Sequence, residues 1–412
     1  MLTGRTEPTQ ATGCAESPAR HLYANDIERL GSFMDARYSL ALLGDFPTAI
    51  ADEIEAALEE RISELGLVLH EDVTLFRGDP RRFRPKFDRC CAALCASINA
   101  TDEAAIEHFI DRRVPLVPVA RDPDTFKAEF PGKLGALNGV AMTQSPAILA
   151  SCLLEASSLI PRQRRVFLSY RRKESTEAAL QLYSELCARQ YDVFLDTHGI
   201  LPGEHFQEVL WQRLCDSDVL VYLDSSGYFK GRWTELEFER ASLRKLAMLR
   251  VGWPRVEATN IHLISGQVQL EDSDLGADRL IQSDALTEIL EKIELYRSKS
   301  VSIRYRDLVG KLTSSVEAAG GKVLGASSRR GLVVSVKNEE IVVYPELRVP
   351  TSESFYEASL EEHSPPVAVI YNEEGIEERT WKAHMQWLGD RLDGHARLVK
   401  ANAAGHRFQD WY

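Results

Sequence analysis

Short apolar runs alternate with longer amphipathic segments along most of this chain, and no other feature restricts its fold as strongly. Residues 40–43, 166–168 and 219–223 have the length and composition of buried strands. In segments such as 50–65 and 178–187, apolar side chains recur every three or four positions, which is the spacing of a helix with one buried face. Strands that alternate with helices form parallel sheets covered by helices on both faces. The sequence therefore predicts an α/β protein.

Changes in this pattern divide the 412 residues into five parts, and a chain of this length has room for two or three domains. Residues 1–36 are rich in small, polar and charged side chains and are expected to form a flexible leader. Two α/β domains are predicted at 37–122 and 163–299, joined by a linker with a packing helix at 123–162. The remainder, 300–412, carries a hairpin pattern and is expected to be an α+β module.

Some elements are predicted in more detail. In the first α/β domain, the second strand is expected at 67–69, and a helix is expected around Phe87. One helix over 286–296 is expected to close the second α/β domain, and a separate helix over 301–319 to open the C-terminal module. The hairpin of that module is expected from two valine-rich runs, 331–336 and 341–344.

The bulk composition argues against several classes of partner. A net charge of −13 does not supply the basic surface that grips nucleic acid through its phosphates. No apolar run is long enough to span a bilayer and the first residues lack the apolar core of a signal peptide, so a cytoplasmic protein without membrane contact is expected. The seven cysteines lack metal-ligand spacing, so we expect reduced thiols and no metal site.

Glu237, near the start of a predicted helix, belongs to two sequence patterns. Thr234 and Glu237 have the spacing of a capping box, in which both side chains satisfy free N–H groups at a helix start. Trp233, Glu237 and Ala241 are four residues apart and share one helical face, whereas Glu239 points elsewhere. Beside an indole, desolvation raises the pKa of a carboxyl, and the helix dipole lowers it. Glu237 is therefore a candidate functional group, with a plain helix cap as the alternative.

Three ordered motifs mark the central domain. It opens with Arg-Val-Phe-Leu-Ser-Tyr-Arg-Arg at 165–172, and Asp-Thr-His-Gly-Ile-Leu-Pro-Gly follows the second strand at 196–203. The stretch 225–233 ends in a tryptophan, and Glu237 comes four residues later. In this order the motifs resemble the first strand and loop, the loop after the second strand, and the catalytic-glutamate segment of the TIR (Toll/interleukin-1 receptor) family, in particular its bacterial NAD-cleaving type.

The resemblance implies the fold class of the whole arrangement. A flavodoxin-like TIR domain would stand in the middle of an α/β chain, with the α+β module after it. The preceding domain, 37–122, is similar to a TIR-like or receiver-like α/β fold. It lacks the Trp-x-x-x-Glu signature, because no tryptophan occurs in the corresponding segment 99–109, and no catalysis is expected there.

The resemblance also implies an activity, hydrolysis of the nicotinamide–ribose bond of NAD. NAD would then be the substrate, and no separate cofactor would be needed. Glu237 would be the catalytic residue, and Tyr170 and Arg171 would contact the nucleotide from the loop after the first strand. Phe206 would pack against the nicotinamide or its ribose, and Trp233 would shape the pocket beside the catalytic carboxylate.

Similar TIR enzymes complete their sites between neighbouring protomers, which implies self-association through TIR domains and activity on assembly, as in an anti-phage immune effector. Two other functions stay open. The protein could be a TIR scaffold that recruits other TIR proteins, with Glu237 as a helix cap only, or a nucleotide sensor that binds its ligand without cleaving it. By elimination, the module 300–412 is the candidate for recognising a small nucleotide or protein activator.

Overall fold

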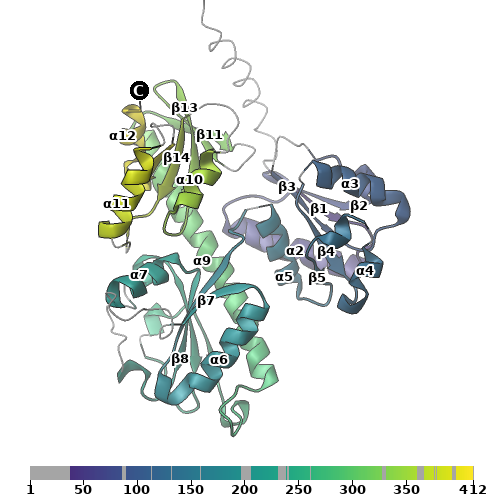
Figure 1. Cartoon of the computed structure of the whole chain (residues 1–412), viewed down its shortest axis with the longest axis vertical. Helices are drawn as coiled ribbons and strands as arrows, with labels where there is room; N and C mark the ends of the chain where they lie inside the picture. The colour runs from purple at the N-terminus through teal and green to yellow at the C-terminus, as the bar shows by residue number, and fades with distance from the viewer. Residues whose placement is uncertain are drawn as a thin grey trace, which may run out of the picture.

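The computed structural model contains three α/β units and one long helix, α9, that runs from the lower unit to the upper one (Figure 1). It describes residues 38–85, 90–112, 114–130, 132–157, 159–195, 206–230, 238, 241–259, 261–326, 331–359, 366–374, 376, 378–391 and 396–411. The predicted leader 1–36 and the centre of the helix predicted around Phe87 lie outside the described residues. Among the helices that the structure describes, none has both the length and the apolar character needed to cross a membrane.

The first unit is a parallel sheet with helices on both faces. Its strands are β1 (Tyr38–Leu43), β2 (Val73–Gly78), β3 (Cys90–Cys95), β4 (Leu116–Ala120) and β5 (Val140–Ala141). They lie in the order β2-β1-β3-β4-β5, and each neighbouring pair is parallel. One face is covered by two helices, α2 (Thr48–Glu64) and α5 (Pro146–Ala156). The other is covered by α3 (Glu103–Asp111) and the short α4 (Phe126–Glu129).

The strand predicted at 67–69 is wrong. Leu69 makes only an isolated bridge to Val73, and the strand that pairs with β1 begins at Val73. The backbone N–H of Val73 donates to the carbonyl of Val68 at 3.3 Å, and His70 has a left-handed backbone with φ 69°. Residues 67–69 are therefore used to turn the chain from α2 back toward the sheet, and three apolar residues in a row do not distinguish such a turn from a strand.

The second unit repeats the architecture of the first. Its strands are β6 (Arg164–Ser169), β7 (Tyr191–Leu195), β8 (Val219–Asp224), β9 (Ala247–Gly252) and β10 (Gly266–Gln269). The order β10-β9-β8-β6-β7, counted within the unit, is the order of the first sheet, again with parallel neighbours. On one face lie α6 (Arg172–Ala188) and the first half of α9; on the other lie α7 (Phe206–Asp216) and residues 241–243. This is the flavodoxin-like arrangement, which confirms the predicted fold class.

The third unit has a mixed sheet, as predicted for an α+β module. Its strands are β11 (Lys322–Ala326), β12 (Leu332–Val336), β13 (Glu339–Glu346), β14 (Val367–Tyr371) and β15 (Ala396–Lys400). The first three are antiparallel and the last three parallel. The predicted hairpin is formed by β12 and β13, and its turn residues Lys337 and Asn338 have the positive φ angles, 53° and 66°, that fit a two-residue hairpin turn. The helices of this unit are α10 (Ser352–Ser359), α11 (Glu378–Gly389) and α12 (Ala404–Gln409).

The helix α9 (Ser283–Ala318) is continuous over 36 residues, which corresponds to a length of about 54 Å. The prediction of two helices, 286–296 and 301–319, is therefore wrong, and the domain boundary predicted at residue 300 falls inside one helix. The cause lies in the polar stretch 297–304, which reads as a break in the apolar pattern. Its arginine and serine side chains are mostly buried, because groups of the neighbouring units bind them, and the helix continues through them.

Apolar packing joins the first unit to the third. The apolar cluster on one face of the first sheet continues through the second half of α9 into the core of the third sheet. The residues of α9 in this shared cluster are Val301, Leu308, Leu312 and Val316. The two apolar clusters of the second unit are separate from it. A small separate cluster packs Cys215 of α7 against Val349, Tyr371 and Ile376 of the third unit. The second unit is therefore held to the others by the N-terminal half of α9, by this small cluster and by polar contacts.

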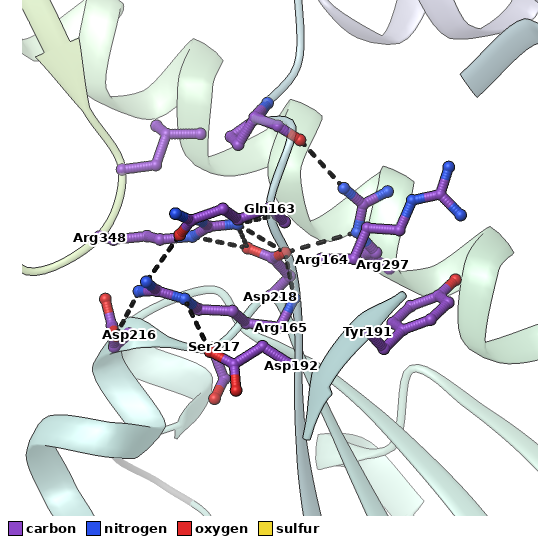
Figure 2. A network of polar contacts seen from close by, with 12 residues as sticks. Gln163, Arg164, Arg165, Tyr191, Asp192, Asp216, Ser217, Asp218, Arg297 and Arg348 are labelled. Atoms are coloured by element: carbon purple, nitrogen blue, oxygen red, sulfur yellow. Dashed lines mark hydrogen bonds and ion pairs between the residues drawn. The ribbon is translucent and has the colours of Figure 1, made fainter. Parts of the chain in front are cut away.

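Those polar contacts form a buried ion-pair network, here called the junction, around Asp218 at the start of β8 (Figure 2). The Asp218 carboxylate accepts two hydrogen bonds from Arg348 Nη2, at 2.9 and 3.1 Å, and one from the backbone N–H of Arg165 at 3.0 Å. Arg297 of α9 lies 3.4 Å away and is fully buried. Burial alone would raise the pKa of Asp218, but Arg348 and Arg297 hold it below its usual range. Because Arg348 follows β13, this carboxylate links the second unit to the third.

The junction also reaches the first unit. Arg297 Nη2 lies 3.0 Å from Glu155 Oε1 of α5, and Arg164 of β6 donates to the same carboxylate at 2.8 Å. Tyr191 of β7 donates to Glu294 of α9. The six charged residues of the junction are Glu155, Arg164, Asp218, Glu294, Arg297 and Arg348.

Replacing Asp218 tests how much the junction contributes to stability. Asp218→Asn keeps the shape of the side chain but leaves Arg348 and Arg297 buried without their carboxylate, so we expect the free energy of unfolding to fall by about 3–5 kcal/mol. The exposed pair between Arg255 and Asp272 offers a matched control, since both side chains are mostly in solvent. Asp272→Asn should change the stability by less than about 0.5 kcal/mol. Urea unfolding monitored by circular dichroism measures both, and equal effects of the two substitutions would contradict the role given to the junction.

Candidate functional site at the ends of β6 and β8

The second unit has its topological switch point between β6 and β8. The chain leaves β6 toward β7 on one side and returns to β8 on the other, so the loops after β6 and β8 diverge at the carboxyl ends of adjacent strands. Open α/β sheets bind their ligands at this point. The side chains that meet here come from residues 169–175, after β6, and residues 224–230, after β8.

Glu174 connects the two loops. Its carboxylate accepts a hydrogen bond from Arg171 Nη1 at 2.5 Å and another from the backbone N–H of Gly227 at 3.0 Å. Three neighbours lower the pKa of Glu174: the Ser225 hydroxyl most, then the Gly227 amide and Arg171. Ser225 Oγ lies close to the carboxylate but outside standard hydrogen-bond geometry. Glu174 therefore stays ionised and fixes the loop after β8 relative to the start of α6.

Gly227 leaves room for this ion pair directly above the backbone of the loop. A Cβ atom at residue 227 would lie 1.3 Å from Arg171 Nη1 and 2.6 Å from Glu174 Oε1, well inside the distance that real Cβ contacts allow. The absence of a side chain lets the backbone approach the ion pair closely enough to donate to it. Arg171 is thereby held at the switch point with its side chain about one-third exposed.

Aromatic packing against β6 and β8 anchors the loop after β8. Tyr228 donates a hydrogen bond from its hydroxyl to Ser169 Oγ at 2.8 Å, at the end of β6. Tyr222 of β8 stacks on Tyr228 with ring centroids 5.4 Å apart and meets Phe238 edge-on at 5.0 Å. Phe238 is fully buried, so the position directly after Glu237 in the sequence is fixed against the middle of β8.

A buried ion pair supports the other side of the loop. Arg250 Nε of β9 donates to Asp224 Oδ2 at 2.6 Å, and both side chains are almost fully buried. The same guanidinium donates to Gln269 Oε1 at 2.8 Å and to the carbonyl of Val256 at 2.6 Å. Burial raises the pKa of Asp224 and the bond from Arg250 opposes that rise. The pair fixes the last residue of β8, where the loop begins.

The structure describes the side chains of two of the five predicted site residues, Tyr170 and Arg171. Tyr170 is buried in the core between the sheet and α6, and Arg171 lies at the switch point beside Glu174. Phe206 begins α7, but its side chain lies outside the part of the chain that the structure describes. Trp233 and Glu237 also lie outside it. The roles predicted for these residues stay predictions.

Sequence reasoning missed the groups that organise the loops. Glu174 lies three residues after Arg171, a spacing at which oppositely charged side chains meet on a helix, and that signal was available. Nothing local marks Gly227 or the pairing of Asp224 with Arg250, because their partners are 26 or more residues away in the chain. Among the described residues, no cluster of histidine, cysteine and carboxylate side chains is suited to hold a metal ion.

Comparison with known proteins agrees with this geometry. The model of a TIR domain family matches residues 166–281, which run from β6 past β10. The chain carries a TIR domain. The match spans the second unit with both loops of the switch point and the Trp233–Glu237 segment, as the three sequence motifs predicted. No curated protein matches the chain significantly.

Three solved structures show distant similarity beyond the TIR domain. A protein described as a two-component system response regulator/GGDEF domain protein has 12% identity and a TM-score of 0.29, over 62% of this chain and 97% of its own. A protein from Salmonella typhimurium described as sugar-binding has 10% identity and a TM-score of 0.19, over 70% and 95%. The C-terminal domain of glucosamine-fructose-6-phosphate aminotransferase from Francisella tularensis has 9% identity and a TM-score of 0.19, over 68% and 87%.

A double-mutant cycle tests the close approach in the TIR domain. Gly227→Ala should lower the free energy of unfolding by about 1–3 kcal/mol, because the new methyl group collides with Arg171. In an Arg171→Ala background the obstacle is gone, so the same substitution should cost less than about 1 kcal/mol. Urea unfolding of the four proteins measures the coupling. Equal costs in both backgrounds would show that Arg171 does not occupy the space above Gly227.

Proposed function

We propose that the TIR domain is an NAD glycohydrolase, which releases nicotinamide and leaves ADP-ribose or a cyclised form of it. The observation that supports this most is the place of the Trp233–Glu237 segment in the chain. It follows the loop after β8, which leaves the sheet at the switch point beside Arg171. Ala241, which the sequence places on the same helical stripe as Glu237, is fully buried against the sheet.

One carboxylate suffices for this chemistry. Nicotinamide leaves NAD as a neutral ring from a cationic one, so no general acid has to protonate the leaving group. The ribose then develops positive charge at its anomeric carbon in an oxocarbenium-like transition state. Glu237 would accept hydrogen bonds from the ribose hydroxyls and offset that charge, and the interaction strengthens as the charge grows.

The described residues supply the complementary part of the site. The Arg171 guanidinium, held by Glu174 and Gly227, is a fixed cation that can meet the negative phosphates of the dinucleotide. Tyr170 is buried, so we propose that its contribution is to hold the loop in place and that Arg171 makes the ligand contact. Phe206 and Trp233 keep the roles that the family resemblance gave them, beside nicotinamide and beside Glu237.

A second candidate function is a non-catalytic TIR scaffold. The TIR domain exposes large apolar side chains, including Leu243 at 66%, Leu180 at 43% and Tyr183 at 37%. Leu180 and Tyr183 are three residues apart on α6 and form one apolar patch. Such patches favour association with another protein surface. A scaffold would use such patches. An enzyme that becomes active on self-association, as expected of an anti-phage immune effector, would use them too. Only a measurement of NAD turnover therefore separates the two functions.

Turnover of NAD by the purified chain tests the proposal. Wild-type protein should release nicotinamide, with a rate per protomer that rises with protein concentration if the site is completed on assembly. Glu237→Gln should lower the turnover number at least 100-fold, a loss of about 2.7 kcal/mol or more in transition-state stabilisation, while the circular dichroism spectrum stays unchanged. Glu239→Gln removes the same charge from another face of the predicted helix and should keep the activity within about twofold.

Two outcomes would favour the scaffold instead. One is a wild-type protein without nicotinamide release at any concentration at which it self-associates. The other is a Glu237→Gln variant that unfolds more easily but keeps its turnover number, as expected if the carboxylate only caps a helix.

A further inference from the structure

An open groove lies along α9, away from the switch point of the TIR domain. It has a volume of about 680 Å³, and its wall is formed by Arg306, Asp307, Gly310, Lys311 and Ser314 of α9, with Asn402 of the third unit opposite. Pockets for small-molecule ligands have volumes of roughly 300–1,000 Å³. A single inorganic phosphate would occupy little of this space, whereas a mononucleotide would fill much of it.

A glycine in the last third of α9, Gly310, lines this groove. Gly310 lies within a 36-residue helix, where glycine is less favourable than alanine because it gains nothing from a side chain and loses more backbone freedom on folding. A Cβ atom at this position would meet no other atom within 4 Å. No packing contact therefore requires glycine at 310, and its effect is to leave the floor of the groove clear.

The groove offers donors for an anion. The side chain of Arg306 lines the groove and packs beside Gly66 at the end of α2, where a Cβ would lie 3.5 Å from Arg306 Nε. Among the described residues, the structure records no hydrogen-bond or ion-pair partner for its guanidinium. Lys311 Nζ lies 3.1 Å from Asp307 Oδ2 and 3.4 Å from Glu374 Oε1. Lys245 of the TIR domain also binds Asp307. Three cations thus face two carboxylates here, and Arg306 is the one without a counter-charge.

We propose that this groove binds a small phosphate-bearing ligand of nucleotide size, with Arg306 and Lys311 as its cationic contacts and Ser314 and Asn402 as neutral hydrogen-bonding partners. Guanidinium and ammonium groups form charge-assisted hydrogen bonds with phosphate oxygens. Asp307 does not repel the ligand strongly, because Lys245 and Lys311 neutralise it. The inference concerns binding and does not depend on NAD cleavage by the TIR domain.

Hydrogen bonds and ion pairs connect the groove to the TIR domain and to the third unit. Arg244 and Lys245 end the segment that follows Glu237 in the sequence, and Arg244 Nη1 donates to the carbonyls of Asn372 and Glu374 at 2.8 Å. Glu374 therefore holds Arg244 with its carbonyl and Lys311 with its carboxylate. A phosphate that takes Lys311 away from Glu374 would loosen this link and change how the TIR domain is held. Ligand binding in the groove would thus change the local stability of residues 241–246.

Calorimetric titration of the full chain with ADP, and separately with inorganic pyrophosphate, tests the site. Wild-type protein should bind ADP, and affinity should fall at high ionic strength because the contacts are between exposed charges. Arg306→Ala should weaken binding at least tenfold. In an Arg171→Ala background, which removes the phosphate contact proposed for the TIR site, Gly310→Leu should abolish ADP binding, because leucine fills the groove while it suits the helix better than glycine does.

Three controls keep the test specific. Arg407→Ala removes an exposed arginine of α12 outside the groove, and Gly310→Ala adds only a methyl group, so both should bind ADP within twofold of wild type. Arg171→Ala should also keep the binding, which distinguishes the groove from the switch point of the TIR domain. Hydrogen exchange of residues 241–246 should change on addition of ADP to wild-type protein and not to Gly310→Leu.

The proposal is overturned if wild-type protein binds neither ADP nor pyrophosphate at millimolar concentration. It is equally overturned if Arg306→Ala and Gly310→Leu bind as wild type does. Binding of pyrophosphate with an affinity equal to that of ADP would show that the groove recognises phosphate alone, and would reject a nucleotide-sized ligand.

Discussion

The buried carboxylate of Asp218 is the interaction on which the relative placement of the three units depends. It lies directly before β8 and is bound by Arg348 of the third unit and Arg297 of α9, which in turn binds Glu155 of the first unit. Charges buried this deeply are stable only while each partner stays in place, because an unpaired one would carry the full cost of desolvation. These ion pairs therefore fix the second unit relative to the other two, which apolar packing along α9 already joins.

The two flavodoxin-like sheets share a strand order but differ at their switch points. In the first unit, a Cβ at Gly44 would lie 2.8 Å from the carbonyls of Ala96 and Ser97, so the loops after β1 and β3 close on each other through their backbones. At the same point of the TIR domain, the side chains of Arg171 and Glu174 face the backbone of the opposite loop.

The strand–helix alternation, the hairpin and the TIR motifs could be predicted because each is local. The hairpin turn at Lys337 needs only two residues that tolerate positive φ between two apolar runs. The two errors have different causes. The run 67–69 looks like a strand but closes a turn, and the polar stretch 297–304 looks like a break between two helices but continues one helix. Hydrogen bonds within about five residues make the turn at 67–69, whereas the partners that bury the polar side chains of 297–304 lie in other units.

The sequence by itself therefore determined the fold class, the TIR domain and the identity of a candidate carboxylate, Glu237, because periodicity and motif spacing are written in neighbouring residues. The tertiary structure alone decided that α9 is one helix shared by three units, that Asp218 and Arg297 meet, and that Gly310 faces open space. The physical reason is that the burial of a charge and the shape of a groove depend on many contacts between segments far apart in the chain. No short stretch of sequence specifies those contacts.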